Sequence, residues 1–160
     1  MPLKAGARRM LGVLAAFHPR PVSRRQLGVL SRMTAGGGTF DRYLSTLRSA
    51  GLVRDLPDKR LELTDAGAAK IEGTKQEPPE GEELVALYRN RLKAGARRMV
   101  DVLVERRGRW TSRDHLAKLA GLSRGGTFDR YLSSMRSLDL VEERGGELQI
   151  SEDLWWRAGR

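Results

Sequence analysis

The chain has 160 residues, of which 39% are apolar and 31% are charged; this balance indicates a globular protein with one domain or two small ones and excludes a wholly disordered chain. The formal net charge of +10 predicts a polyanionic partner, with nucleic acid as the first class to consider. Because the sequence contains no cysteine, a disulfide framework, a thiol nucleophile and a cysteine-ligated zinc site are excluded.

The first predicted element is a helix over roughly Lys4–Phe17, where apolar residues recur at helical spacing. Basic residues before an apolar run also occur in secretory signal peptides. The same pattern returns in mid-chain as LKAGARRMVDVLV at Leu92–Val104, where a signal peptide has no place. We therefore interpret both stretches as the first helix of a repeated domain. We expect a cytoplasmic protein with no membrane partner, since no apolar run approaches the length that spans a bilayer.

Further elements follow in the first copy. Ser23 and Gln26 form a capping-box pattern that opens a second helix. After a turn at residues 34–38, Thr39 is predicted to cap a third helix that ends at Gly51. Two short apolar segments around Leu-Pro-Asp-Lys predict a β-hairpin, and Thr-Asp-Ala-Gly begins a last short helix. Helix, helix, helix, hairpin is the order of a winged helix-turn-helix domain.

An acidic segment, Glu72–Glu83, separates the two copies, and its Pro-Pro-Glu-Gly centre disfavours regular structure. A short helix is predicted over Leu84–Leu92, with Leu84, Leu87, Tyr88 and Leu92 near one side. The predicted division is a first domain at 1–71, a linker and connecting helix at 72–91, and a second domain at 92–160.

The second copy repeats the order of the first. Ser112 is predicted to cap its second helix and Thr127 its third, and Glu-Arg-Gly-Gly-Glu turns its hairpin. Trp155 and Trp156, in a final segment, are expected to close the second core. The expected fold class is therefore α+β, mainly α with small β-hairpins, built as tandem winged helix-turn-helix domains.

The octapeptide GGTFDRYL is predicted to form the turn and the start of the third helix in both copies, at Gly37–Leu44 and Gly125–Leu132. A phosphate loop of the Walker type needs a lysine after its glycines, and neither glycine cluster is followed by one. We therefore interpret the glycines as a turn between two helices. In helix-turn-helix proteins the helix after such a turn lies in the major groove, with its N-terminal residues nearest to the base edges.

A helical wheel separates each third helix into an apolar and a polar side. The polar sides are expected to face outward, where an arginine can bind guanine in a bidentate way and hydroxyls can reach phosphates or bases. The inward sets are Phe40, Tyr43, Leu44 and Leu47, and Phe128, Tyr131, Leu132 and Met135. The outward sets are Arg42, Ser45, Thr46 and Ser49, and Arg130, Ser133, Ser134 and Ser137.

The predicted DNA contacts combine these outward sides with the start of the second helix and the first hairpin. They are Arg24, Arg25, Thr39, Arg42, Ser45, Thr46, Ser49, Arg54, Lys59 and Arg60 in the first copy, and Arg113, Thr127, Arg130, Ser133 and Ser134 in the second.

Charge distinguishes the two copies. Residues 1–71 hold 13 Lys and Arg against 5 Asp and Glu, a net charge of +8, whereas residues 92–160 hold 14 against 10, a net charge of +4. The second hairpin carries Glu142, Glu143 and Glu147, which a phosphate backbone would repel. We therefore expect the first copy to be the better DNA binder.

No catalytic or metal-binding spacing is found in the sequence. Asp41 and Asp129 are expected in the first turn of a helix, where carboxylates suit the helix dipole, and no second carboxylate or histidine accompanies them. His18 and His115 belong to no metal-ligand motif. We expect no enzyme activity, no cofactor and no bound metal.

The two copies together resemble the C-terminal region of HerA/FtsK-type ATP-binding proteins from bacteria and phages. There a tandem winged-helix pair carries a similar GGTF-x-x-YL-x-x-LR block in each copy. The matching residues are Gly37–Leu44 with Leu47 and Arg48, and Gly125–Leu132 with Met135 and Arg136. The segment GEELVALYRNRL is similar to that family's connecting helix.

The resemblance implies a DNA-translocating or DNA-processing motor as the context, with this chain engaging DNA or regulating the motor. No ATPase domain precedes the first copy, so we expect an excised module or a stand-alone relative. An ATPase domain or subunit is then a second partner to test for, beside double-stranded DNA.

The sequence thus predicts a non-enzymatic DNA-binding module, and the resemblance implies that it is an accessory or regulatory part of a DNA-processing ATPase system. Two alternatives stay open. One is a protein-interaction adaptor of the tandem winged-helix kind, which has less need of a strongly basic face. The other is a transcription regulator, for which the sequence has no obvious effector domain.

Overall fold

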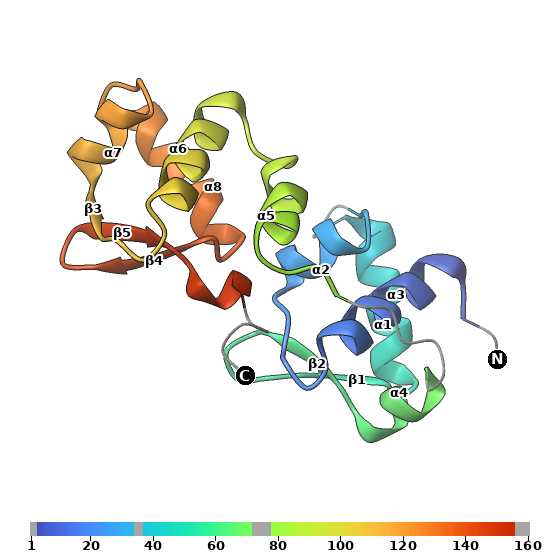
Figure 1. Ribbon diagram of the computed structural model, residues 1–160. Helices are drawn as coiled ribbons and strands as arrows, with labels where there is room; N and C mark the ends of the chain where they lie inside the picture. Colours follow the sequence, from blue (N-terminus) through green and yellow to red (C-terminus); the bar gives the residue numbers. More distant parts are fainter. Residues whose placement is uncertain (1–2, 34–36, 72–77, 156–160) are drawn as a thin grey trace. The chain divides into compact units, whose positions relative to one another are not determined.

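The computed structural model describes residues 3–33, 37–71 and 78–155 (Figure 1). The chain divides into two compact units, Met1–Pro78 and Pro79–Arg160. Each unit joins several helices to a small antiparallel sheet, so the predicted α+β class, mainly α with small hairpins, is confirmed.

The first unit follows the predicted order of elements. These are α1 (Ala5–Phe17), α2 (Arg24–Leu30), α3 (Gly38–Ser49), β1 (Val53–Asp55), β2 (Leu61–Leu63) and α4 (Asp65–Lys70). The capping box is present at α2: the Ser23 hydroxyl accepts the Gln26 N–H, and the Gln26 side chain accepts the Ser23 N–H. Gly51, just beyond α3, has φ +72°, the left-handed conformation expected after a helix.

The core of the first unit lies between α1 and the elements packed on it. Helix α1 contacts α2, α3, α4 and β2, and Met10, Leu11 and Leu14 are fully buried on it. The strands β1 and β2 pair antiparallel, with Val53 opposite Leu63, and both side chains are buried. Helix α1 is thus the central element of the first unit, on which three helices and a strand pack.

The second unit begins with the connecting helix and then repeats the first. Its elements are α5 (Glu82–Arg89), α6 (Ala94–Glu105), β3 (Thr111–Ser112), α7 (Arg113–Leu119), α8 (Gly126–Ser137), β4 (Val141–Arg144), β5 (Glu147–Ile150) and η1, a 3-10 helix (Glu152–Trp155). The Ser112 hydroxyl accepts the His115 N–H, as predicted for the cap of α7. Gly145 and Gly146 turn the hairpin with φ +55° and +83°, as a tight two-residue turn requires.

One strand of the second unit was not predicted. The short β3 pairs with β5 and makes the sheet three-stranded, with Thr111 opposite Leu148. At the equivalent place in the first unit, Val22 and Leu61 form an isolated bridge. A strand of two residues carries no alternating pattern by which a sequence could reveal it.

The predicted caps of the third helices are wrong. Thr39 and Thr127 lie inside α3 and α8, because Gly38 and Gly126 already belong to the helices, and the N-cap residues are Gly37 and Gly125. Neither glycine offers a side-chain cap. Thr39 and Thr127 are therefore exposed residues of the first helical turn.

The connecting helix α5 packs on α6 with a face rotated from the predicted one. Leu84, Val85 and Tyr88 are buried, whereas Leu87 is 39% exposed. Val85 lies about 100° from Leu84 around the helix axis, so the buried face turns toward it and away from Leu87. Burial also raises the pKa of the Tyr88 hydroxyl.

Trp155 closes one edge of the second unit. Its half-buried ring lies against Gly81 at the start of α5, and the Arg107 guanidinium stacks 3.9 Å from the ring centroid. The expectation that Trp156 shares this role falls outside the described residues.

Candidate nucleic-acid interface

Helices α3 and α8 present the predicted inner and outer sides. Phe40, Leu44 and Leu47 are at most 1% exposed, and their counterparts Phe128, Leu132 and Met135 are buried as well. Tyr43 and Tyr131 are half-buried. The outward side of α3 is exposed at Arg42, Ser45, Thr46 and Ser49, and that of α8 at Arg130, Ser133 and Ser134, while Ser137 is half-buried.

Two sequence motifs occur twice in the chain, LKAGARRM at the first helix of each copy and GGTFDRYL at the third. In each unit, these two motifs contact one another. Gly6 of α1 lies against the ring of Tyr43, and Gly95 of α6 lies against the ring of Tyr131. A Cβ atom at either glycine would overlap its ring. Glycine is therefore required where the first helix meets the third, and this contact fixes the rotation of α3 and α8 about their axes.

A second repeated contact fixes the helix before the turn. The Arg9 guanidinium of α1 donates to the Ser31 carbonyl at 3.1 Å, and the Arg98 guanidinium of α6 donates to the Ala120 carbonyl at 3.0 Å. Ser31 and Ala120 are the C-cap residues of α2 and α7. Arginine thus satisfies a carbonyl that the helix end leaves without a partner, and the first helix positions both helices of the turn.

Arg42 has no such structural role. Its side chain is exposed, and among the described residues its guanidinium has no hydrogen-bond or ion-pair partner. Arg130, at the same place in α8, is also exposed, and its guanidinium donates to the Thr127 hydroxyl at 3.1 Å. Each outward side therefore carries an exposed arginine, and the donors of the Arg42 guanidinium are all available to a ligand.

The hydroxyls beside these arginines differ in what they can offer. The Thr46 hydroxyl donates to the Arg42 carbonyl, and the Ser134 hydroxyl donates to the Arg130 carbonyl. Each of these oxygens remains an acceptor, which can receive an N–H group of a base. Ser45 and Ser133 are exposed with no such bond in the described part of the chain, so they can also donate to a phosphate.

The start of α2 supplies one occupied and one available cation. The Arg24 guanidinium pairs with Asp41 of α3 at 2.6 Å and stacks 5.4 Å from the Phe40 centroid. Arg25 is exposed and forms no ion pair with the described residues. Of the two predicted contacts, Arg25 is thus the better placed to neutralise a phosphate.

The first hairpin offers fewer unpaired cations than its composition predicted. Arg54 of β1 bonds to Glu62 of the paired strand β2, with Nε donating at 2.6 Å, and Arg60 lies 3.7 Å from Asp58. Lys59 is exposed between the strands, with φ +70° and no ion pair to a described residue. Only one of the three predicted hairpin cations therefore lacks an internal carboxylate.

In the second unit, a carboxylate of the hairpin accepts hydrogen bonds from two helices. Glu143 of β4 accepts hydrogen bonds from Arg136 of α8 and Arg113 of α7. The Arg136 guanidinium is the main cause that lowers the pKa of the Glu143 carboxyl from its ordinary value. Arg113, a predicted DNA contact, is consequently engaged within the unit.

The two units thus differ in the cations near the outward side of their third helix, which is α3 in the first unit and α8 in the second. In the first unit, Arg25, Arg42 and Lys59 are exposed without an ion-pair partner among the described residues. In the second, Asp114 stands where the first has Arg25, and it pairs with Arg124 at 2.6 Å.

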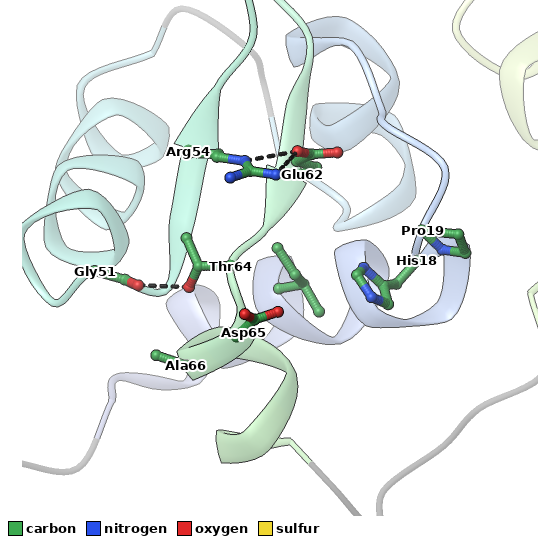
Figure 2. A pocket seen from close by; sticks show the side chains of 9 residues that line it. His18, Pro19, Gly51, Arg54, Glu62, Thr64, Asp65 and Ala66 are labelled. Atoms are coloured by element: carbon green, nitrogen blue, oxygen red, sulfur yellow. Dashed lines mark hydrogen bonds and ion pairs between the residues drawn. The ribbon is translucent and has the colours of Figure 1, made fainter.

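One cavity of about 450 Å³ lies in the first unit beside the hairpin (Figure 2). Figure 2 shows Arg54 and Glu62 facing each other on its wall, and the Thr64 hydroxyl bonded to the Gly51 carbonyl. His18 also lines it, at the end of α1. Because Arg54 pairs with Glu62 and Thr64 with Gly51, two of the polar contacts of this lining are internal, and we assign no site to it.

No candidate metal site is found in the described part of the chain. Over residues 3–33, 37–71 and 78–155, no three histidines or carboxylates are grouped as metal ligands. Likewise, none of the described helices has the length and apolar character needed to cross a bilayer.

Comparisons with family models, curated proteins and solved structures gave no match to the chain. The resemblance to the C-terminal region of HerA/FtsK-type proteins therefore stays a prediction.

Proposed function

We propose that the protein binds double-stranded DNA through the outward side of α3, and that it does so without catalysing a reaction. The observation that carries this proposal is Arg42, an exposed arginine without a described partner on a helix whose opposite side is locked into the core. Arginine with short hydroxyl neighbours suits the major groove, because it can approach closely and bind guanine by two hydrogen bonds.

The order of elements supports this docking. Three helices followed by a hairpin, with a turn between α2 and α3, are the parts of a winged helix-turn-helix domain. In such domains the helix after the turn enters the major groove, which here is α3. The hairpin would then lie near the phosphate backbone, where Lys59 is the available cation.

Charge supports DNA over a neutral ligand. The first domain carries a net charge of +8, and Arg25, Arg42 and Lys59 have no carboxylate partner among the described residues. Each cation that neutralises a phosphate releases counterions, so binding must weaken as salt concentration rises.

The wider role rests on the sequence resemblance. A chain similar to the C-terminal region of HerA/FtsK-type proteins would be an accessory or regulatory part of a DNA-processing ATPase system. The purified chain would then alter the DNA-stimulated ATP hydrolysis of a partner motor without hydrolysing ATP itself.

The test is a titration of labelled duplexes of several defined sequences with the whole chain at about 50 and 200 mM salt. We expect wild-type affinity to fall steeply between the two. Arg42→Ala should weaken binding by about 1–3 kcal/mol if Arg42 binds a base, and Arg130→Ala should weaken it less. Lys59→Ala should weaken all sequences alike and reduce the salt slope by about 1.

Lys70→Ala is the matched control, because it removes one exposed charge from α4, whose main contacts are with α1 and β2. If it weakens binding as much as Arg42→Ala does, net charge and not α3 carries the affinity. If wild-type chain binds no duplex at low salt but binds a protein through the outward side of α3, the adaptor alternative holds.

A further inference from the structure

We propose that α3 and α8 bind the same short base sequence, so that the DNA ligand of the chain carries two copies of one element. This inference rests on the proposed function, and it extends DNA binding to the second unit. Its ground is the equivalence of two outward sides within one chain.

The two outward sides match position by position. Arg42 corresponds to Arg130, and Thr46 to Ser134, a pair that differs by one methyl group. Three further pairs are identical in residue type: Thr39 with Thr127, Ser45 with Ser133, and Ser49 with Ser137. Since base recognition depends on donors and acceptors at fixed spacing, equal side chains on equal helices favour equal sequences.

The helices also present most of these side chains in the same way; the exception is Ser137, which is half-buried whereas Ser49 is exposed. Both have 12 residues and begin at the second glycine of the repeated octapeptide. Each has its rotation fixed by the contact of a tyrosine with a glycine of the first helix, Tyr43 with Gly6 and Tyr131 with Gly95. Four residues after Arg42, the Thr46 hydroxyl donates to the Arg42 carbonyl. The Ser134 hydroxyl donates to the Arg130 carbonyl in the same way.

The two units differ in the charges that would meet the phosphate backbone. Arg25 is replaced by Asp114, and the second hairpin holds Glu143 between Arg113 and Arg136. Phosphate contacts contribute affinity without sequence information. The second unit should therefore bind the same element more weakly than the first.

Linkage within one chain compensates for this weakness. Once the first unit is bound, binding of the second becomes intramolecular, at an effective concentration set by the linker. A duplex with two elements at a reachable spacing should then bind the whole chain at least about tenfold more tightly than a duplex with one.

The experiment is selection from a random duplex library with whole chains of three kinds: wild type, Arg130→Ala and Arg42→Ala. Each variant keeps one intact outward side, and both substituted residues are exposed. We expect the two variants to enrich the same short element as a single copy. Wild type, and the control Lys70→Ala, should enrich two copies.

A fourth chain guards against weak binding by the second unit. Asp114→Arg in the Arg42→Ala background places at α7 the cation that the first unit has as Arg25, and it should raise the affinity several-fold while enriching the same element. The proposal is overturned if the two variants enrich different elements, if both chains with Arg42→Ala enrich nothing, or if wild type gains nothing from a second element. A wild-type chain that binds no duplex at all would instead defeat the proposed function.

Discussion

Gly95→Ala should destabilise the second unit, because it forces a methyl group into the contact between α6 and α8. The added Cβ would overlap Cε2 of Tyr131 and lie 2.8 and 3.0 Å from Cζ and Cδ2 of the same ring. Ordinary carbon contacts are about 3.5–4.0 Å. Either the ring or the helix must move, and Gly95 itself is buried.

The magnitude follows from two opposing effects. Overpacking of a well-packed site costs about 1–3 kcal/mol. Alanine in place of glycine returns at most about 1 kcal/mol in a helix interior, and less in the first turn, where Gly95 lies. We therefore expect the free energy of unfolding to fall by about 1–2 kcal/mol, or the urea midpoint by about 1 M.

Tryptophan fluorescence during urea unfolding is the assay, since all three tryptophans of the chain lie within the second domain. The matched control is Gly126→Ala, also in a first helical turn of this unit, where an added Cβ would lie 3.9 Å from Nη1 of Arg130, at an ordinary contact distance. It should be neutral or slightly stabilising. In a Tyr131→Ala background Gly95→Ala should lose its cost; an unchanged cost there would refute the steric argument.

Two further predictions concern the second unit and use the same assay. Glu143→Gln should lower the free energy of unfolding of the second unit at about pH 7 by up to about 1 kcal/mol, as for exposed ion pairs. Arg136 lowers the folded-state pKa of Glu143. The difference in unfolding free energy between wild type and variant should therefore disappear as pH falls below that pKa. An equal difference at about pH 3 would contradict this linkage. Ser112→Ala should cost about 1 kcal/mol by removing the cap of α7, whereas the exposed Ser133→Ala, which caps no helix, should cost almost nothing.

The sequence was sufficient for those parts of the fold that local patterns determine. Helical spacing located α3 and its buried Phe40, Leu44 and Leu47, and the capping box located the start of α2 at Ser23. The start of α3 was misplaced because threonine is a favoured cap and glycine in a helix is not. Here the backbone at Gly38 is helical all the same.

The pairing of charges could not be predicted in the same way. Arg54 and Arg60 looked available by composition, yet each lies beside a carboxylate. Arg24 pairs with Asp41, and Arg113 pairs with Glu143. In both pairs the carboxylate lies on a different element of the fold from the arginine. Such pairs depend on how helices and hairpins pack, which no local pattern in the sequence records.

The structure separates two reasons for which residues recur between the copies. Gly6 and Tyr43, like Gly95 and Tyr131, recur because they touch, and a change in one would disturb the other. The arginines at 42 and 130 are exposed, and substitutions at such surface positions usually alter stability by less than about 0.5 kcal/mol.

Stability therefore does not explain why these two arginines are alike, particularly since the hairpins of the same two units differ in charge: residues 53–63 hold three basic and three acidic side chains, and residues 141–150 hold one basic and three acidic. If the outward sides bound unrelated partners, nothing in the fold would hold their side chains to one pattern. The proposed shared DNA ligand would explain the likeness, because an arginine flanked by small hydroxyls can bind base edges in the major groove.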